Sequence, residues 1–147
     1  MLSQKAKYAL KAMIVLARHD GQGLLQAADI SETESVPKKF LEVILLELRK
    51  QGLVVSVRGK NGGHQLAKPA DAITLGQIIR IMDGPLAPIP CASLTGYRRC
   101  SDCRDEKACA IRRAMREVRD AAAAVLDGTT LADACNSKSM TQQLAAG

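Results

Sequence analysis

Aromatic side chains are almost absent from this chain, which has no Trp, one Phe and two Tyr among 147 residues. A buried core without large rings must be built from aliphatic side chains, and apolar residues still make up 47% of the sequence. This composition favours helices packed through small aliphatic layers. The length suits one domain with a core plus an extension, because two full domains would be cramped.

Long apolar runs and catalytic motifs are also missing. No run reaches the length of a membrane span, and residues 1–5 lack the apolar core of a signal peptide. We therefore expect a cytoplasmic protein that does not bind membranes. With only two histidines, no Gly-rich phosphate loop and no nucleophile motif, the sequence also argues against an enzyme.

Negative charge is scarce in the first half of the chain. The net charge is +6; residues 1–70 hold 11 Lys or Arg against 6 Asp or Glu, whereas residues 71–147 hold 10 against 9. A basic half joined to a nearly neutral one indicates a polyanion-binding surface next to a part with another task. On charge alone, however, the simpler explanation is an ordinary solvated basic face.

Three helices are predicted within residues 3–52. Ser3 can cap the first, which has a helical apolar repeat to about His19; a short helix over residues 25–31 and a polar turn over residues 32–35 follow. Pro37 suits the first turn of the third helix. Two helices joined by a tight turn, the second basic at its N-terminus, match a helix-turn-helix whose second helix enters the major groove. The expected buried positions of the third helix are Phe40, Leu41, Ile44, Leu45 and Leu48, and its expected outer face is Lys38, Lys39, Glu42, Val43 and Leu46.

A β-hairpin is predicted directly after the third helix. Residues 53–57 and 64–67 are the expected strands, and Asn61-Gly62 is a strong hairpin signal because both residues accept positive φ. A basic hairpin in this place is a wing, whose Arg58 and Lys60 can reach a minor groove or phosphates. The alternative is an ordinary surface hairpin with two stray cations; we favour the wing because it follows the recognition helix so closely.

The longest helical pattern runs over residues 105–126, after a shorter helix over residues 74–82 that a capping box at Thr74 and Gln77 begins. We expect the long helix to form a homodimer interface, because it exceeds what a small winged domain can cover; the alternative is that it packs only on its own domain. A turn over residues 130–134 and a disordered tail follow. The apolar seam is Ile111, Met115, Val118, Ala122 and Val125, and the arginines expected on the wet face beside it are Arg112, Arg113, Arg116 and Arg119.

Four of the five cysteines fall within nineteen residues, as Cys91-x8-Cys100-x2-Cys103-x5-Cys109. In the cytoplasm such a group is more typical of metal ligands or redox thiols than of structural disulfides. Four thiolates can bind [4Fe-4S], [2Fe-2S] or Zn²⁺, and a metal-free sensor in which Cys100 and Cys103 pair is a third alternative. Cys135 is expected to be a spare or packing residue. Positive neighbours that favour the thiolate form are Arg98, Arg99, Arg104 and Lys107.

Residues 2–135 resemble the Rrf-two type of bacterial winged-helix regulators. The most specific stretch is residues 56–63, Ser-Val-Arg-Gly-Lys-Asn-Gly-Gly; residues 7–9, 40–42 and 48–54 support it. The resemblance implies that Glu42 contacts a base, such as a cytosine amino group, and that Arg58 enters the minor groove. It implies the following DNA-binding residues: Tyr8, Pro37, Lys38, Lys39, Glu42, Arg58, Gly59, Lys60 and Asn61.

The chain departs from this family at several positions. Pro37 and Lys39 replace small hydroxyl residues of the recognition helix, so a different half-site is expected, and His64 replaces the usual Tyr of the wing. A further departure lies in the cysteine loop, because Arg112 and Lys7 stand where members of the family supply His or Asp as a fourth cluster ligand.

Cluster-binding members of the family use three cysteines, the last two separated by five residues, plus that variable fourth ligand. Cys91, Cys103 and Cys109 match these three positions. We infer that Cys100, which is extra relative to the family, takes the fourth place. The resemblance therefore implies an iron–sulfur cluster held by Cys91, Cys100, Cys103 and Cys109, with zinc or no metal as the alternatives.

These patterns predict a mainly α (α+β) protein: a winged helix-turn-helix domain over residues 1–84, a cysteine-rich sensor loop over 85–104, a dimerisation helix over 105–127, and a turn and flexible tail over 128–147. The expected function is a DNA-binding transcription regulator, a repressor, controlled by a cluster or by redox state at the loop. It would sense iron, cluster supply, oxidant or nitric oxide. The alternatives are a regulator with structural zinc or a metal-free thiol switch and, more remotely, a metal- or partner-binding module that does not bind DNA.

Overall fold

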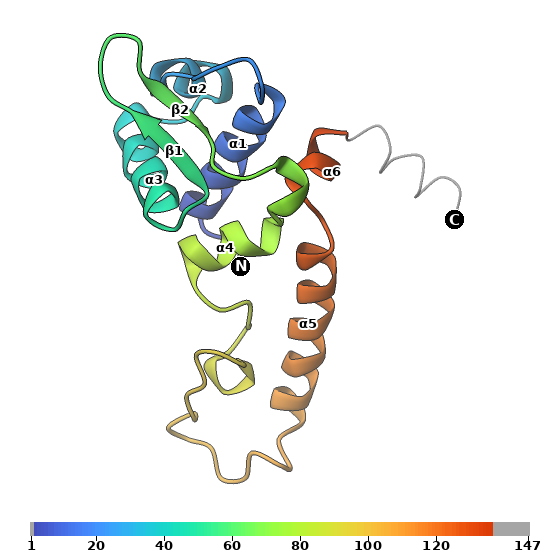
Figure 1. Ribbon diagram of the computed structural model, residues 1–147. Helices are drawn as coiled ribbons and strands as arrows, with labels where there is room; N and C mark the ends of the chain where they lie inside the picture. The colour runs from blue at the N-terminus through green and yellow to red at the C-terminus, as the bar shows by residue number, and fades with distance from the viewer. Residues whose placement is uncertain (1, 137–147) are drawn as a thin grey trace.

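Three helices and a hairpin form the upper part of the molecule, and a long helix with an extended loop projects below them (Figure 1). The computed structural model describes residues 2–136. The predicted class, mainly α with a small sheet, is confirmed. In chain order the elements are α1 (Gln4–Arg18), α2 (Ala27–Glu34), α3 (Lys38–Lys50), β1 (Val54–Val57), β2 (Gly63–Leu66), the 3-10 turn η1 (Ala70–Ala72), α4 (Leu75–Asp83), the 3-10 turn η2 (Pro90–Ala92), α5 (Ala110–Asp127) and α6 (Leu131–Cys135).

The aliphatic stripes of α1 and α3 form the core, as the helical repeats predict. Ser3 caps α1 by accepting a hydrogen bond from the N–H of Ala6 at 3.0 Å. Burying one Leu or Ile side chain stabilises the fold by about 1.5–3 kcal/mol, so this pair of helices is the main support of the domain. The inward side chains, each at most 2% exposed, include Ala9, Ala12, Met13, Leu16, Leu41, Ile44, Leu45 and Leu48.

Two expectations for the helix-turn-helix are wrong in detail. The polar turn predicted over residues 32–35 shrinks to Ser35, whose φ of 54° ends α2, because the helix continues to Glu34. Phe40, predicted to be buried, is 42% exposed. It lies at the edge of the stripe, where its ring packs edge-on against Tyr8 with centroids 5.6 Å apart. The core position next to this turn belongs to Val36 instead, which is 1% exposed.

The predicted hairpin forms, with β1 antiparallel to β2, but its turn is not the one expected at Asn61-Gly62. The N–H of Gly62 donates to the carbonyl of Gly59 at 3.0 Å, and Gly59, rather than Asn61 or Gly62, has a positive φ, of 108°. A side chain is excluded at Gly62 because a Cβ there would lie 2.0 Å from the carbonyl oxygen of Val57. This wider turn presents Lys60 and Asn61, both exposed, at the tip of the wing.

The chain after α5 returns to the winged domain. Leu131, at the start of α6, is fully buried, and its N–H donates to the carbonyl of Ile73 at 2.9 Å. The N–H of Leu75 donates in turn to the carbonyl of Thr129 at 2.9 Å. The turn predicted over residues 130–134 is thus a capped helical turn that completes the core beside α1. The flexible tail predicted beyond it lies outside the described residues.

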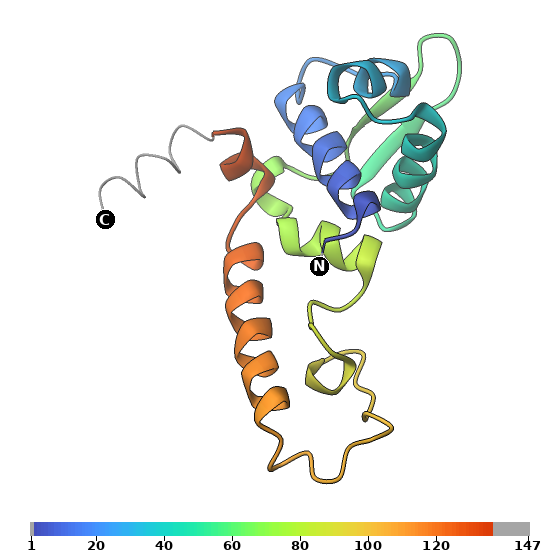
Figure 2. The same cartoon turned by 180° about the vertical axis from the view of Figure 1, so that it is seen from behind.

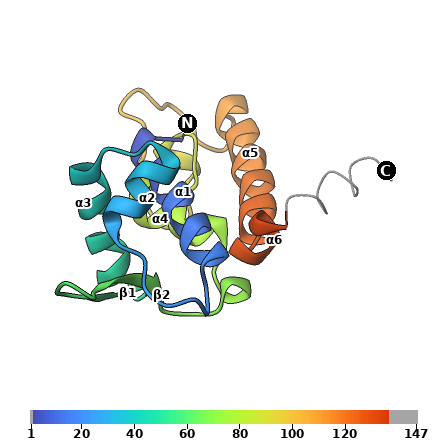
Figure 3. The same ribbon diagram turned by 90° about the horizontal axis from the view of Figure 1, so that it is seen from above.

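The long helix α5 begins at Ala110, five residues later than the pattern from Asp105 predicts. Its N-cap is Cys109, whose sulfur accepts a hydrogen bond from the N–H of Arg112 at 3.4 Å. Seen from behind and from above, α5 stands apart from α3 and the sheet (Figures 2 and 3). Within residues 2–136, no helix is both long and apolar enough to cross a membrane.

Candidate DNA-binding face and cysteine loop

The outer face of α3 and the wing lie at one end of the molecule. Because the chain reverses after α3 at Gln51 and Gly52, the N-terminus of α3 and Arg58 at the end of β1 lie at the same end (Figure 1). A positive groove-facing surface of this kind suits phosphate contact at its rim and base contact from the helix. Every residue predicted for these two elements is exposed: Pro37, Lys38, Lys39, Glu42, Arg58, Gly59, Lys60 and Asn61.

The ninth predicted DNA-binding residue, Tyr8, is only half-buried and lies beneath the start of α3. Its ring meets that of Phe40 in a T-shaped contact. Tyr8 therefore supports the recognition helix from α1. Beside it, Val43 on the outer face of α3 is 53% exposed, an apolar side chain among charged ones.

The base of the wing is held by backbone pairing rather than by the hairpin alone. Leu25 and His64 exchange two backbone hydrogen bonds, of 2.9 and 2.7 Å, and Gln26 Nε2 donates to the carbonyl of Lys60 at 3.2 Å. On the wing, Ser56 Oγ and His64 Nδ1 lie 2.7 Å apart. Burial is the main cause that lowers the pKa of His64 below its ordinary value of 6.5, and the Arg49 charge adds to it. Through these contacts His64 packs within the wing.

The first cysteine of the loop sits in a buried turn and the second lies on the surface. Cys91, in η2, is 5% exposed, whereas Cys100 is exposed, and their sulfurs are 3.7 Å apart. The N–H of Arg98 donates to the carbonyl of Pro90 at 3.2 Å, which brings the returning loop against η2. The sulfur that Cys100 meets is therefore that of Cys91, rather than that of Cys103, its partner in the metal-free alternative.

Cys103 and Cys109, both partly exposed, complete the set only loosely. The N–H of Cys103 donates to the carbonyl of Cys100 at 3.3 Å. The hydrogen bond to Cys91 is the first cause that raises the pKa of Cys100, followed by burial and by the charges of Cys91, Asp102 and Cys109. Among the described residues, no three His, Cys, Asp or Glu side chains are grouped closely enough to hold a metal ion.

The donor chemistry of the loop fits an iron–sulfur cluster or zinc even though the sulfurs do not converge. Four thiols within one loop of little regular structure are the ligands that both groups use. Gathering them requires Cys103 and Cys109 to move toward the Cys91–Cys100 pair. Cys135 lies apart, with its sulfur 3.8 Å from the carbonyl of Ile14, and burial raises the pKa of its thiol.

Two arginines of α5 hold the buried cysteine turn, and sequence reasoning assigned both to the wet face of the helix. Arg112 Nε donates to the carbonyl of Cys91 at 2.9 Å, and Arg119 Nη1 donates to the carbonyl of Ala92 at 2.5 Å. Arg119 is only 9% exposed, so its predicted place on the solvated face is wrong. The signal was present in the spacing, because residues seven apart lie on one face of a helix.

The predicted seam of α5 lies on the remaining surface of the helix. Ile111 and Val125 are each 66% exposed and Val118 is 40% exposed, whereas Met115 and Ala122 are partly buried. Val118 and Ala122 line a groove of about 320 Å³ between α5 and residues 85–88. In this single chain the seam is therefore largely uncovered, as an interface for a second copy requires.

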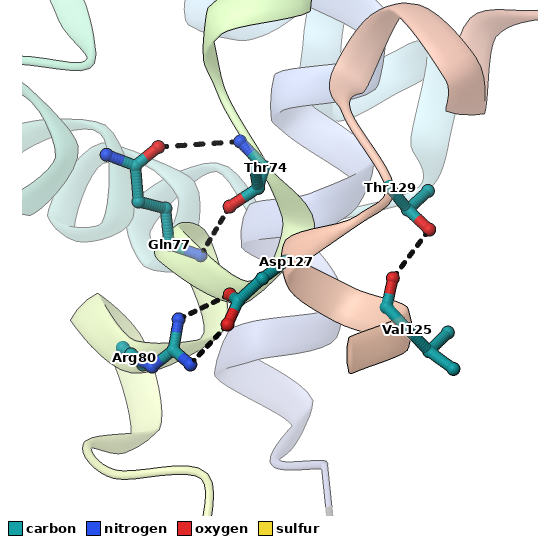
Figure 4. Close-up of polar contacts among 6 residues, drawn as sticks. All are labelled: Thr74, Gln77, Arg80, Val125, Asp127 and Thr129. Carbon is teal, nitrogen blue, oxygen red and sulfur yellow. Dashed lines mark hydrogen bonds and ion pairs between the residues drawn. The ribbon is translucent and has the colours of Figure 1, made fainter. Parts of the chain in front are cut away.

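The far end of α5 is joined to the DNA-binding domain through α4. Arg80 Nη1 and Nη2 donate to Asp127 Oδ1 and Oδ2 at 2.6 and 2.8 Å, and this hydrogen bonding raises the pKa of Arg80 and lowers that of Asp127 (Figure 4). The predicted capping box begins α4 directly beside this pair: Thr74 Oγ1 accepts from the N–H of Gln77 at 3.2 Å. The helix that holds the cysteine turn is thus tied to a helix that packs on α1 and α3.

Comparison with known proteins identifies the family to which this chain belongs. The profile of the Rrf2 family, described as "Iron-dependent Transcriptional regulator", matches residues 2–137. A Rhodobacter capsulatus "HTH-type transcriptional regulator rrf2-like" is 44% identical over 136 residues, covering 90% of this chain and 91% of its own length.

Two solved structures share both fold and sequence. IscR of T. potens superposes with a TM-score of 0.75 at 31% identity, over 97% of this chain and 90% of its own. The oxidized form of Staphylococcus aureus CymR superposes with a TM-score of 0.72 at 32% identity, over 92% of this chain and 95% of its own. The relatives are regulators, which confirms the prediction that the chain is not an enzyme.

Proposed function

The chain belongs to the Rrf2 family of transcriptional regulators, and from this premise we propose that it is a homodimeric, cytoplasmic repressor whose operator binding depends on the state of the cysteine loop. The contact that supports this most directly is the pair of hydrogen bonds from Arg112 and Arg119 to the carbonyls of Cys91 and Ala92. They join the sensor turn to the helix that carries the dimer seam. A change at the cysteines therefore acts on α5 first.

The DNA-binding part of the proposal rests on the exposed face of α3 and the wing. Glu42 accepts a hydrogen bond from a cytosine amino group in the major groove, and Arg58 enters the adjacent minor groove. Lys38, Lys39 and Lys60 contact phosphates, and Tyr8 holds the recognition helix from below. A two-fold dimer presents two such faces to two half-sites one helical turn apart, so the spacing between them controls affinity.

The sensing part of the proposal rests on Cys91, Cys100, Cys103 and Cys109, which would hold an iron–sulfur cluster. A bound cluster would link the four thiolates through its iron atoms, and iron shortage, oxidant or nitric oxide would remove that link. Cys91 is fixed in η2 by Arg112, whereas Cys100 and Cys103 lie on the free part of the loop. Release of these sulfurs lets the loop relax, which shifts α5 and, through Arg80 and Asp127, the DNA-binding domain.

A second candidate is a regulator whose cysteines respond to oxidation without a metal. Two observations favour it: the contact between the Cys91 and Cys100 sulfurs, and the similarity to a CymR structure described as an oxidized form. Structural zinc bound to the same four thiolates would instead keep the loop fixed in all conditions.

Anaerobic purification followed by iron, sulfide and zinc analysis distinguishes these candidates. Bound iron with sulfide supports the cluster, and stoichiometric zinc supports the structural site. Protein that contains neither iron nor zinc supports the thiol regulator. Duplexes selected from sheared genomic DNA are then titrated with protein before and after oxidation. DNA affinity should fall steeply with salt, with each phosphate contact adding about 0.9 to the slope. Salt-insensitive or absent duplex binding in every state would contradict a DNA-binding regulator.

A further inference from the structure

We propose that Cys91 and Cys100 form a reversible disulfide when a peroxide oxidises the loop, with Cys100 as the thiol that is attacked first. This inference deepens the proposed function and rests on it only for its effect on DNA binding. The observation that motivates it is the 3.7 Å contact between the two sulfurs in a loop that is otherwise open.

The backbone holds these two residues in position for the bond. Cys91 lies in η2, where Arg112 Nε binds its carbonyl at 2.9 Å. The chain from Cys91 to Cys100 is closed by the N–H of Arg98, which donates to Pro90, and by the N–H of Gly96, which donates to Ser93 Oγ at 2.8 Å. A disulfide requires the sulfurs to approach to about 2.05 Å, a movement that the exposed end of this loop can make.

The other thiols of the loop are placed differently. Cys109 caps α5 and its sulfur accepts the N–H of Arg112, so a bond from Cys109 would remove the cap. The backbone N–H of Cys103 donates to the carbonyl of Cys100, but the sulfur in contact with the Cys100 sulfur is that of Cys91. Exposure rather than acidity separates the roles. The contact with Cys91 raises the pKa of Cys100, but Cys100 is open to solvent whereas Cys91 is 5% exposed.

The chemistry balances in two steps. Hydrogen peroxide oxidises the exposed Cys100 thiol to a sulfenic acid: a sulfur–oxygen bond forms, the peroxide bond breaks and one water leaves. The Cys91 sulfur then attacks the Cys100 sulfur, the sulfur–oxygen bond breaks, the disulfide forms and a second water leaves. The two thiols together lose two electrons and two protons, and the peroxide is reduced to two waters.

Peptide mapping of the full chain tests the pairing. The anaerobically purified protein is treated with hydrogen peroxide, free thiols are alkylated, and disulfide-linked peptides are identified by mass spectrometry. Trypsin leaves Cys100 and Cys103 on one peptide because Arg99 and Arg104 flank them. A protease that cleaves at Asp102 is therefore needed to separate the two cysteines.

The expected dominant product is a peptide pair joining Cys91 to Cys100, which dithiothreitol separates. The variant Cys103→Ser should keep this product and Cys100→Ser should lose it. With protein freed of metal by a chelator, both should keep the parent's thermal unfolding because neither residue is buried. A dominant bond from Cys91 to Cys103 or Cys109, or peroxide oxidation that leaves no disulfide, would overturn the pairing.

DNA titration of the oxidised protein separates this inference from the proposed function. If the Cys91–Cys100 bond forms and duplex affinity stays within twofold of the reduced protein, the pairing stands and redox control of operator binding fails. If affinity responds to peroxide equally in Cys100→Ser, redox control of DNA binding stands, and the inference that the Cys91–Cys100 bond brings it about is wrong.

Discussion

Arg80 of α4 and Asp127 of α5 form a two-pronged ion pair, with nitrogen–oxygen distances of 2.6 and 2.8 Å, at the junction between the DNA-binding domain and the long helix (Figure 4). Both side chains are about two-fifths exposed, at 40% and 43%, so the pair contributes at most about 1 kcal/mol to stability. Its importance lies in position, because α4 packs on α1 and α3 as well as on α5.

Gly76→Ala should break this ion pair although neither Arg80 nor Asp127 is replaced. A Cβ at Gly76 would lie 2.1 Å from Asp127 Oδ1, and 3.0 Å from Arg80 Nη1. Helix propensity alone predicts a gain of up to about 1 kcal/mol for Gly→Ala, so a measured loss in urea unfolding is diagnostic of the clash. Asp127→Asn is the matched control that weakens the pair while leaving the space at Gly76 open. If Gly76→Ala stabilises the protein instead, the side chains of Asp127 and Arg80 move aside without a measurable cost.

His64 should make the stability of the wing depend on pH near neutrality. Burial and Arg49 lower its pKa in the folded protein, and Glu42 raises it in part. A lowered pKa means that the folded state binds fewer protons than the unfolded state. The contribution of neutral His64 to the free energy of unfolding is therefore fully present above about pH 6.5, and it is lost as pH falls through the lower pKa of the folded protein.

Urea unfolding of the parent and of His64→Gln at about pH 7.5 and about pH 5.5 measures this effect. The parent should lose more stability on acidification than the variant does. His19→Gln, which changes the chain's other histidine, is measured beside it as the control for replacing a histidine by glutamine. Equal slopes for the parent and His64→Gln would remove His64 from this role.

Arg58→Ala should weaken binding to the selected duplex while the fold is unchanged, because Arg58 is exposed at the start of the wing turn. If Arg58 neutralises one phosphate, the slope of log affinity against log salt should fall by about 0.9. Fluorescence anisotropy at several salt concentrations gives both values. Arg113→Ala, which removes an exposed arginine of α5, is the control and should leave the slope as it is.

Val43 should make the recognition helix sensitive to thymine methyl groups. It is 53% exposed beside Glu42, and an apolar side chain in a major groove contacts the 5-methyl of thymine. Replacing each dT of a half-site by dU removes that methyl and should weaken binding by about fourfold at one position, the equivalent of about 0.8 kcal/mol for a buried methylene-sized group. In Val43→Ala the same base change should have less effect, since the partner of the methyl is gone. An unchanged penalty in the variant would assign the methyl contact to another residue.

Much of the fold was accessible from local pattern, whereas the coupling between its parts was not. The caps at Ser3 and Thr74, the stripes of α1 and α3 and the hairpin are all set by residues close in sequence, which is why periodicity and turn chemistry predict them. Arg119 was misplaced and the burial of Leu131 was not predicted, because each depends on a segment more than twenty residues away, η2 for Arg119 and the α4 entry for Leu131. The spacing places Arg119 on the same helix face as Arg112, but the sequence does not show that the carbonyl of Ala92 lies opposite that face.

The cysteine loop shows the same limit. Spacing identified the four thiols, but it did not show which sulfurs meet, and a pair of Cys100 with Cys103 was one of the alternatives. The contact with Cys91 arises because the N–H of Arg98 closes the loop on Pro90, a backbone bond that any residue except proline can make.

Arg119→Met should separate the cysteine turn from α5 and so test the route of the signal. Arg119 is 9% exposed and its guanidinium donates to the carbonyl of Ala92, so the variant leaves that buried acceptor unpaired at a cost of about 1–3 kcal/mol. Methionine keeps much of the side-chain volume, which limits the loss from packing.

Iron and sulfide content and peroxide reactivity of the loop should stay within twofold of the parent, because no cysteine is altered. What should disappear is the change in duplex affinity between reduced and oxidised protein. Arg116→Met, which replaces an exposed arginine one turn earlier, is the control and should respond as the parent does. If Arg119→Met also responds fully, the signal reaches the DNA-binding face without the contact between α5 and η2.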